Sequence, residues 1–198
     1  MNFLAHLYLG DYGHEESAGS VLADFIKGKR SDALPSGIVN GIKLHLAIDD
    51  FTDHHPVFRA SRSRLHQKFS HYAPVAADVF YDHFLAANWN RYSEETLEAF
   101  TKRAFLNMKM HRQHFPLRLK YIFLYNRFQK LLLSYRTEKG VRYAFSRLSG
   151  RARFQSGLEQ ALDELDLNHQ LYQNEFFEFF PDVQNFAKEF MKNKKYSE

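Results

Sequence analysis

Apolar residues recur every three or four positions along most of the chain, a spacing typical of amphipathic α-helices. Strand patterns are scarce. The chain has only nine Gly and five Pro, and no Asn-Gly or Asp-Gly turn sits between two alternating segments. The pattern therefore predicts an all-α protein, built as a single-domain bundle of about seven helices.

The boundaries of the expected helices follow from capping and breaking residues. Ser17 can cap the first helix and Gly28 can stop it, Pro74 suits a first turn, and Pro181 should end the last helix. Residues 1–190 are expected to form the domain and residues 191–198 a frayed tail. The expected helices cover residues 17–27, 36–53, 57–70, 74–89, a fifth starting at 93, 117–136 and 154–180.

Charge is distributed unevenly along the chain. The formal net charge is +4, but residues 109–153 hold twelve Lys or Arg and one acid, Glu138, which gives +11. The remainder therefore carries −7. A basic segment of this kind attracts acidic partners, although it could also be a solvated helical face.

Composition narrows the chemistry and the compartment. The chain has no Cys, which excludes disulfides, thiolate zinc sites and a cysteine nucleophile, and leaves histidine and carboxylate as metal ligands. The first residues lack a basic region typical of a signal peptide, and no apolar run reaches the roughly 20 residues that span a bilayer. We therefore expect a cytoplasmic protein without membrane segments.

A stripe of potential metal ligands runs along the second expected helix. His45, Asp49 and Asp53 are spaced four residues apart, so they lie on one helical face. Imidazole and carboxylate groups that converge from such a face can bind a divalent cation. Alternatively, the stripe is an exposed polar face whose side chains are simply solvated.

The fourth expected helix carries a second set of candidate ligands. Asp78 and Asp82 lie one turn apart, and His83 follows directly. Asp82 occupies the most apolar part of this helix, where a carboxylate without a partner is costly. Asp78 could instead be a surface carboxylate, and His83 a hydrogen-bonded core histidine.

Two further polar residues interrupt apolar segments near the N-terminus. Asp24 follows Val-Leu-Ala, and His6 lies within Phe-Leu-Ala-His-Leu. Aspartate is a poor helix-interior residue and is seldom buried alone, so we expect a metal or a cationic side chain beside Asp24. Taken alone, His6 would be interpreted as a hydrogen-bonded core residue.

Several other kinds of chemistry find no support. The chain has no Gly-rich phosphate loop, no Gly-x-Ser-x-Gly elbow and no paired Glu-x-x-His motifs of a di-iron bundle. The aromatic run at 176–180 is expected in the core, because its neighbours are acidic and unsuited to stacking nucleic-acid bases.

Four blocks of sequence are informative as a set. They are Met-Asn-Phe-Leu-Ala-His-Leu at 1–7, Leu-Ala-Asp-Phe at 22–25, Gly-Ile-x-x-His-x-x-Ile-Asp-x-x-Thr-Asp at 41–53 and Asp-His-Phe-Leu at 82–85. In their order and spacing they resemble one known family, the bacterial acyl carrier protein phosphodiesterases, also called acyl carrier protein hydrolases. Phe179-Phe180-Pro181 is also similar to the family's ending.

The resemblance implies a divergent, all-helical member of the HD phosphohydrolase group. It implies hydrolysis of the phosphodiester that joins 4′-phosphopantetheine to a serine of holo-acyl carrier protein, giving the apo carrier and free 4′-phosphopantetheine. Manganese is the implied metal, with Mg²⁺ or Fe²⁺ as alternatives. Ordinary HD enzymes have a His-Asp doublet, whereas this chain has Asp82-His83 in the reverse order. Ligands cannot therefore be transferred by simple pattern matching.

Within this resemblance, each candidate residue receives a role. Asp53 or Asp78 would accept a proton from water or orient the ligands. Thr52 and Asn2 would donate hydrogen bonds to phosphate, and Lys27, Arg59 or Arg62 could stabilise charge in the transition state. The residues expected to surround one or two divalent ions are His6, Asp24, His45, Asp49, Asp82 and His83.

The resemblance also suggests a function for the basic segment. Acyl carrier proteins are small and strongly acidic, so this segment is a candidate docking surface. The residues expected to lead it are Arg118, Lys120, Arg127, Lys130 and Arg136.

Two other functions stay open at this point. An HD-type phosphohydrolase acting on a nucleotide or another small phosphodiester would share the metal site but need no protein-docking surface. A non-enzymatic, helical nucleic-acid-binding protein would use the basic segment. It would leave the carboxylates and histidines before residue 85 unexplained, so nucleic acid is not the expected partner.

Overall fold

The computed structural model describes residues 2–26, 34–122, 127–150 and 156–195, and every regular element within them is helical. The expected all-α class is confirmed, while the likeness to HD phosphohydrolases stays a prediction. The α-helices are α1 (Phe3–Leu9), α2 (His14–Leu22), α3 (Ser36–His54), α4 (Pro56–Phe69), α5 (Ala73–Ala87), α6 (Leu97–Met110), α7 (Leu117–Ile122), α8 (Arg127–Ser134), α9 (Glu138–Ser149), α10 (Ala161–Leu167) and α11 (His169–Lys195). Short 3₁₀ turns include η1 (Ala23–Phe25) and η3 (Ser70–Tyr72).

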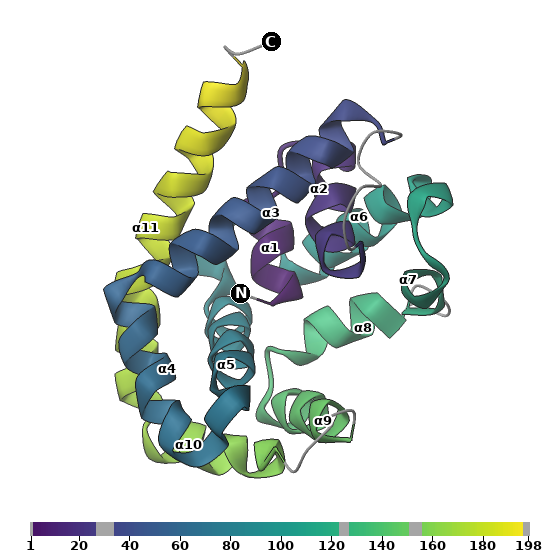
Figure 1. The fold of residues 1–198 in the computed structure, drawn as a ribbon. Coiled ribbons are helices and arrows are strands. Elements are labelled where there is room, and N and C mark those ends of the chain that lie inside the picture. Colours follow the sequence, from purple (N-terminus) through teal and green to yellow (C-terminus); the bar gives the residue numbers. More distant parts are fainter. Residues whose placement is uncertain (1, 27–33, 123–126, 151–155, 196–198) are drawn as a thin grey trace.

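The helices α2 and α3 pack unusually close together, and two glycines make this possible. A Cβ on Gly19 would overlap the backbone carbonyl of Ile38, and a Cβ on Gly41 would overlap that of Glu16. Figure 1 shows α3 crossing the molecule beside α2 and α1 before the chain turns into α4. The close approach brings backbone groups of α2 within reach of side chains on α3.

Helix α5 is the most apolar element of the core. Eleven of its fifteen residues are buried, so the two polar residues among them, Asp82 and His83, must find partners inside the protein. Helix α1 packs against α5, and α11 lies along α3, α4 and α5. The aromatic run of α11 lies in this core as expected, with Phe176, Phe179 and Phe180 fully buried.

The boundaries of the N-terminal helices differ from the expected ones. Helix α1 was not predicted, because seven residues carry too little periodicity. Helix α2 starts at His14 rather than at 17 and gives way to η1 after Leu22, while Lys27 and Gly28 lie outside the described residues. Helix α6 begins at Leu97 rather than at 93, because Thr96 is its N-cap and accepts the N–H of Ala99.

The C-terminal half is divided more finely than expected. The helix expected at 117–136 is α7 and α8, with 123–126 outside the described residues, and the one expected at 154–180 is α10 followed by α11. Pro181 lies inside α11 instead of ending it. Buried Phe180 and Val183 on either side hold the helix against the core, which outweighs the lost backbone hydrogen bond. Helix α11 runs to Lys195, past the expected start of the tail.

One hydrophobic core cluster contains residues from α1 through α11, which agrees with a single packing unit. Among the described residues, no helix combines the length and apolar character needed to cross a membrane.

Candidate metal centre

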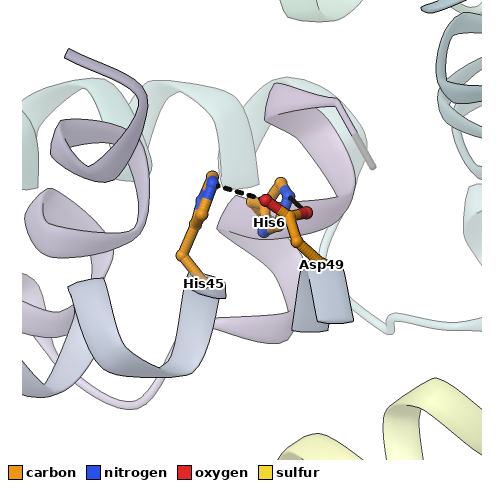
Figure 2. A group of neighbouring side chains, drawn as sticks. All are labelled: His6, His45 and Asp49. Atoms are coloured by element: carbon orange, nitrogen blue, oxygen red, sulfur yellow. Dashed lines mark ion pairs between the residues drawn. The ribbon is translucent and has the colours of Figure 1, made fainter. Parts of the chain in front are cut away.

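Two helices bring three potential ligands to one point. His6 comes from α1, while His45 and Asp49 lie one turn apart on α3, and Figure 2 shows the three side chains converging. The Asp49 carboxylate lies between the imidazoles, with Oδ1 3.0 Å from His6 Nε2 and Oδ2 3.1 Å from His45 Nε2. The two rings stack with centroids 3.7 Å apart. Within the described part of the chain, this is the only cluster of three or more His, Cys, Asp or Glu with metal-site geometry.

The orientation of His45 is fixed by the backbone of α2. Its Nδ1 lies 2.7 Å from the carbonyl oxygen of Ser20, a distance at which Nδ1–H donates a hydrogen bond. In the neutral tautomer this leaves the lone pair of Nε2 pointing at Asp49. A ring nitrogen held by a backbone carbonyl, with the other nitrogen presented to a site, is the usual arrangement of a metal-binding histidine.

His6 is buried without a well-directed hydrogen bond. Its side chain is only 1% exposed, and among the described residues neither ring nitrogen has a hydrogen-bond partner. The Asp49 oxygen comes within 3.0 Å of Nε2 but off the direction in which an N–H could donate. A buried polar group without a partner is expensive, so the geometry favours a further group beside Nε2.

Charge in the cluster is shared unequally. Burial and the neighbouring His45 lower the pKa of His6 to about 4, so His6 is neutral at physiological pH. Burial opposes ionisation of His45, but the carboxylates of Asp24 and Asp49 outweigh it and raise its pKa to about 9. Burial likewise opposes ionisation of Asp49, yet the two histidines hold its pKa well below its usual range. The carboxylates of Asp24 and Asp49 therefore favour a positive charge beside Nε2 of His45.

These three side chains fit a divalent cation. Ligand atoms about 2.1 Å from one ion and at right angles to each other lie about 3 Å apart, which matches the two separations from Asp49. Two imidazoles and a carboxylate suit manganese, iron or zinc better than calcium. The Asp49 side chain is 41% exposed, so one side of the cluster is open to solvent.

Asp24 lies at the edge of this cluster. Its Oδ1 is 3.4 Å from Nε2 of His45, and its side chain is 46% exposed on η1. Asp24 can therefore act as an outer ligand or as a counter-charge to His45.

The two residues expected to take up a proton lie nearby but differ in setting. Burial raises the pKa of Asp78 although the N-terminal amino group opposes the shift, and smaller contributions from the charges of Asp49 and Asp53 place Asp78 within electrostatic reach of the cluster. Asp53 is exposed and pairs with Arg62 at 2.9 Å. Asp78 is thus the carboxylate whose environment favours proton uptake.

The structure does not bring Asp82 and His83 into the cluster. The Asp82 carboxylate accepts the backbone N–H groups of Leu4 at 2.9 Å and Ala5 at 3.1 Å. His83 Nδ1 lies 2.8 Å from the carbonyl oxygen of Tyr135, to which it donates, and burial lowers its pKa. Both residues face other elements because α5 packs against α1 and α9 rather than against the His45 face of α3.

The two expected phosphate donors are also engaged elsewhere. Asn2 is the N-cap of α1, where its Oδ1 accepts the N–H of Phe3 and its Nδ2 donates to the Tyr135 hydroxyl at 3.0 Å. The Thr52 hydroxyl donates to the Ile48 carbonyl at 2.7 Å within α3. Neither polar group points at the cluster.

The expected docking residues lie on α7, α8 and the turn after α8. Lys120, Arg127 and Lys130 are exposed, and Arg136 pairs with Glu98 at 2.6 Å, while the side chain of Arg118 lies outside the described part. Helix α8 packs beside the site, because the ring of Phe128 meets that of Phe3 on α1 at 5.6 Å.

Sequence reasoning missed two supporting contributions. The Ser20 carbonyl that orients His45 is a backbone group and leaves no sequence signal. Tyr135, which links Asn2 to His83, was not singled out either. Small residues such as Gly19 and Gly41 inside predicted helices were an available sign of a close helix crossing, which is what brings Ser20 to His45.

Comparison with known proteins gives a consistent result. The family model for acyl carrier protein phosphodiesterase matches residues 1–183. Proteins named acyl carrier protein phosphodiesterase from Salmonella paratyphi A, Enterobacter and Escherichia coli are 30%, 29% and 29% identical to this chain over 182 residues. Each alignment covers 91% of this chain and 94% of the relative.

No solved structure matches the chain. The family match spans both helices of the metal cluster, since α1 and α3 lie within residues 1–183. This chain therefore belongs to the acyl carrier protein phosphodiesterase family.

Proposed function

We propose that this protein is a metal-dependent phosphodiesterase acting on holo-acyl carrier protein. It would hydrolyse the phosphodiester between 4′-phosphopantetheine and the carrier serine, giving apo carrier and free 4′-phosphopantetheine. The observation that carries the proposal is the meeting of buried His6 and His45 at the Asp49 carboxylate in a chain of this family.

His6, His45 and Asp49 would hold the divalent ion, with Asp24 at its edge. Manganese is the proposed ion, with Mg²⁺ or Fe²⁺ as alternatives, and one or two ions could be present. Such an ion lowers the pKa of water and neutralises the phosphodiester oxygens. The two imidazole donors beside the Asp49 carboxylate favour Mn²⁺ or Fe²⁺ over Mg²⁺, which prefers oxygen ligands.

Three residues around the cluster would have separate roles in the reaction. Asp78 would accept the proton of the attacking water, because burial and nearby carboxylates raise its pKa. Asp53, one helical turn from Asp49 on α3, instead forms an ion pair with the guanidinium of Arg62. Ser20 fixes the ring of His45 so that Nε2 faces the site throughout.

The exposed bases of α8 would assist docking of the acidic carrier. Arg127 and Lys130 flank Phe128, whose ring contacts Phe3 three residues before His6. Positive charge on a helix that contacts α1 would raise the rate at which an acidic protein associates with the site.

The substrate is tested by offering alternatives to the same enzyme preparation. Holo-carrier and a panel of free nucleotides are incubated separately with the protein and Mn²⁺, and products are followed by mass spectrometry. Loss of the phosphopantetheine group from the carrier, without comparable nucleotide hydrolysis, supports the proposal. Nucleotide turnover with an unchanged carrier would instead indicate a small-molecule phosphohydrolase.

A further inference from the structure

A concave basic surface runs along α4, outside the metal centre. It extends from the start of α4 to the first turn of α5 and encloses about 690 Å³. Among the residues that the structure describes, no acid lines it. We call it the α4 groove, and its lining residues are Pro56, Arg59, Ala60, Arg62, Ser63, His66, Ser70, His71 and Pro74.

The charge of the groove follows directly from the sequence. No Asp or Glu occurs between Asp53 and Asp78, while α4 alone contributes three Arg and one Lys. The positive charge of α4 is therefore offset by no acid within this stretch, and its acidic partners, Asp53, Glu164 and Glu175, come from outside it.

The four bases of α4 divide by helical face. Arg64 makes a two-pronged ion pair with Glu175 of α11, and Lys68 pairs with Glu164 of α10. These two bases fasten α4 to the C-terminal helices. Arg59 and Arg62 lie one turn apart on the other face and both line the groove. Arg62 pairs with Asp53 of α3, so the charge left on the groove is that of Arg59.

Two histidines complete the groove. His66 Nδ1 lies 3.0 Å from the Ser70 carbonyl, so a donated hydrogen bond fixes the ring in place. Ser70 has φ 48°, a left-handed conformation that a residue with a Cβ adopts only when its surroundings enforce it. His71 follows on η3 at the end of α4.

Arg59 is exposed and makes no ion pair within the described residues, which leaves its charge open to a partner.

An ion pair links the groove to the helix that carries His45 and Asp49. Asp53 lies one turn beyond Asp49 on α3, about 6 Å along the helix axis, and its carboxylate contacts Arg62 of the groove at 2.9 Å. A ligand lying in the groove would therefore have one end near the turn of α3 that follows Asp49.

We propose that the α4 groove binds an acidic helix of the carrier protein, next to the serine whose phosphodiester reaches the metal centre. This inference rests on the proposed function. Arg59 and His66 are seven residues apart, so their positions are separated by about 10 Å along the axis of α4. A single phosphate is too small to reach both side chains, whereas carboxylates on successive turns of a bound helix can do so. The groove thus adds a second basic flank to the site, separate from the bases of α8.

The test measures binding of the apo carrier, which cannot be turned over, to the Mn²⁺-loaded enzyme by titration calorimetry. The key variant is Arg59→Glu, because Arg59 has no described ion pair whose loss would disturb folding. Arg59→Lys keeps the charge. The matched control is Lys102→Glu, an exposed base on α6 outside both basic surfaces.

We expect Arg59→Glu to weaken binding at least fivefold at low salt, Arg59→Lys to bind within twofold of wild type, and Lys102→Glu to bind normally. The difference for Arg59→Glu should shrink near 0.5 M salt, where the Debye length falls to about 4–5 Å. Equal binding by Arg59→Glu and wild type overturns the inference, as does absence of binding to wild type.

A parallel assay of holo-carrier hydrolysis separates the two proposals. If wild type hydrolyses holo-carrier but Arg59→Glu binds apo carrier as wild type does, the docking inference fails and the function stands. If apo carrier binds in an Arg59-dependent way but wild type never releases phosphopantetheine, the proposed function fails while the docking surface stands.

Discussion

The fully buried carboxylate of Asp82 accepts the backbone N–H of Leu4 at 2.9 Å, joining α5 to the first turn of α1. Its other oxygen accepts the N–H of Ala5, and the Asn2 side chain accepts that of Phe3. The free amides at the start of α1 are thereby satisfied. Since His6 is the next residue, Asp82 positions a proposed metal ligand without touching the cluster.

Replacing Asp82 by Ala should destabilise the protein and weaken metal binding together. Two buried amides would lose their acceptor, and each unsatisfied buried donor costs about 1–3 kcal/mol. We expect the free energy of unfolding, measured by denaturant titration, to fall by at least about 2 kcal/mol. Mn²⁺ affinity measured on the folded variant should also fall. The control is Asp53→Ala, whose exposed ion pair should contribute at most about 1 kcal/mol. Equal losses in the two variants would contradict the capping role.

The same carboxylate should make stability depend on pH. Burial raises the pKa of Asp82 to about 7, from an ordinary value of 3.8, despite the opposing hydrogen bonds from Leu4 and Ala5. Between these two values the folded protein binds more protons than the unfolded chain, so stability from this group falls as pH rises toward 7. Denaturant titrations of wild type and Asp82→Asn at pH 5 and pH 8 isolate this contribution. The free energy of unfolding of wild type minus that of the variant should be lower at pH 8 than at pH 5. An equal difference at both pH values would show that Asp82 does not titrate in this range.

The glycine at the crossing of α2 and α3 gives a test of the scaffold. In Gly19→Ala, the new Cβ would overlap the Ile38 carbonyl, and the shift would move Ser20 away from His45. We expect a loss of about 1–3 kcal/mol in the free energy of unfolding, together with weaker Mn²⁺ binding. In Gly150→Ala the methyl group meets only ordinary contacts, and φ is −66°, so stability should hold or rise slightly. Similar results for both variants would mean that the close crossing is unimportant.

Much of this architecture was accessible from the sequence, and the missing parts share one physical cause. Helix α3 and the pairing of His45 with Asp49 follow from local periodicity, since residues four apart must share a face. The partners of Asp82 could not be predicted, because Leu4 is 78 residues away and contributes only its backbone. Its apolar setting correctly indicated a partner but could not distinguish a metal from a helix terminus.

Pro181 illustrates the opposite limit. Local rules predict that a proline ends a helix, yet α11 continues through it because the residues on both sides are buried in the core. His6 was similarly ambiguous, since its environment is created by α3, far along the chain. Packing between distant segments therefore decided both outcomes, and a single sequence does not encode it in a readable pattern.

Metal binding should stabilise the folded protein through the three clustered side chains. Mn²⁺ at about 100 times its Kd would add about 2.7 kcal/mol to wild type, which thermal unfolding detects as a higher Tm. His6→Ala should lose this increase, because a ligand is removed. The control is His54→Ala, on the same helix as His45 but with its side chain 76% exposed, and it should respond as wild type does. A full Mn²⁺ response in His6→Ala would remove this residue from the site.

The central claim is that His45 holds the ion on which phosphodiester hydrolysis depends, and release of phosphopantetheine from holo-carrier tests it most directly. Mass spectrometry would follow the reaction with wild type, His45→Ala and the exposed control His54→Ala, each with Mn²⁺ and with chelator, after circular dichroism shows that all are folded. Wild type and His54→Ala should react only with Mn²⁺. His45→Ala should be slower by at least about 100-fold, because even groups that merely support metal ligands contribute 10–100-fold. Turnover by folded His45→Ala at the wild-type rate, or wild-type turnover unaffected by chelator, would contradict the claim.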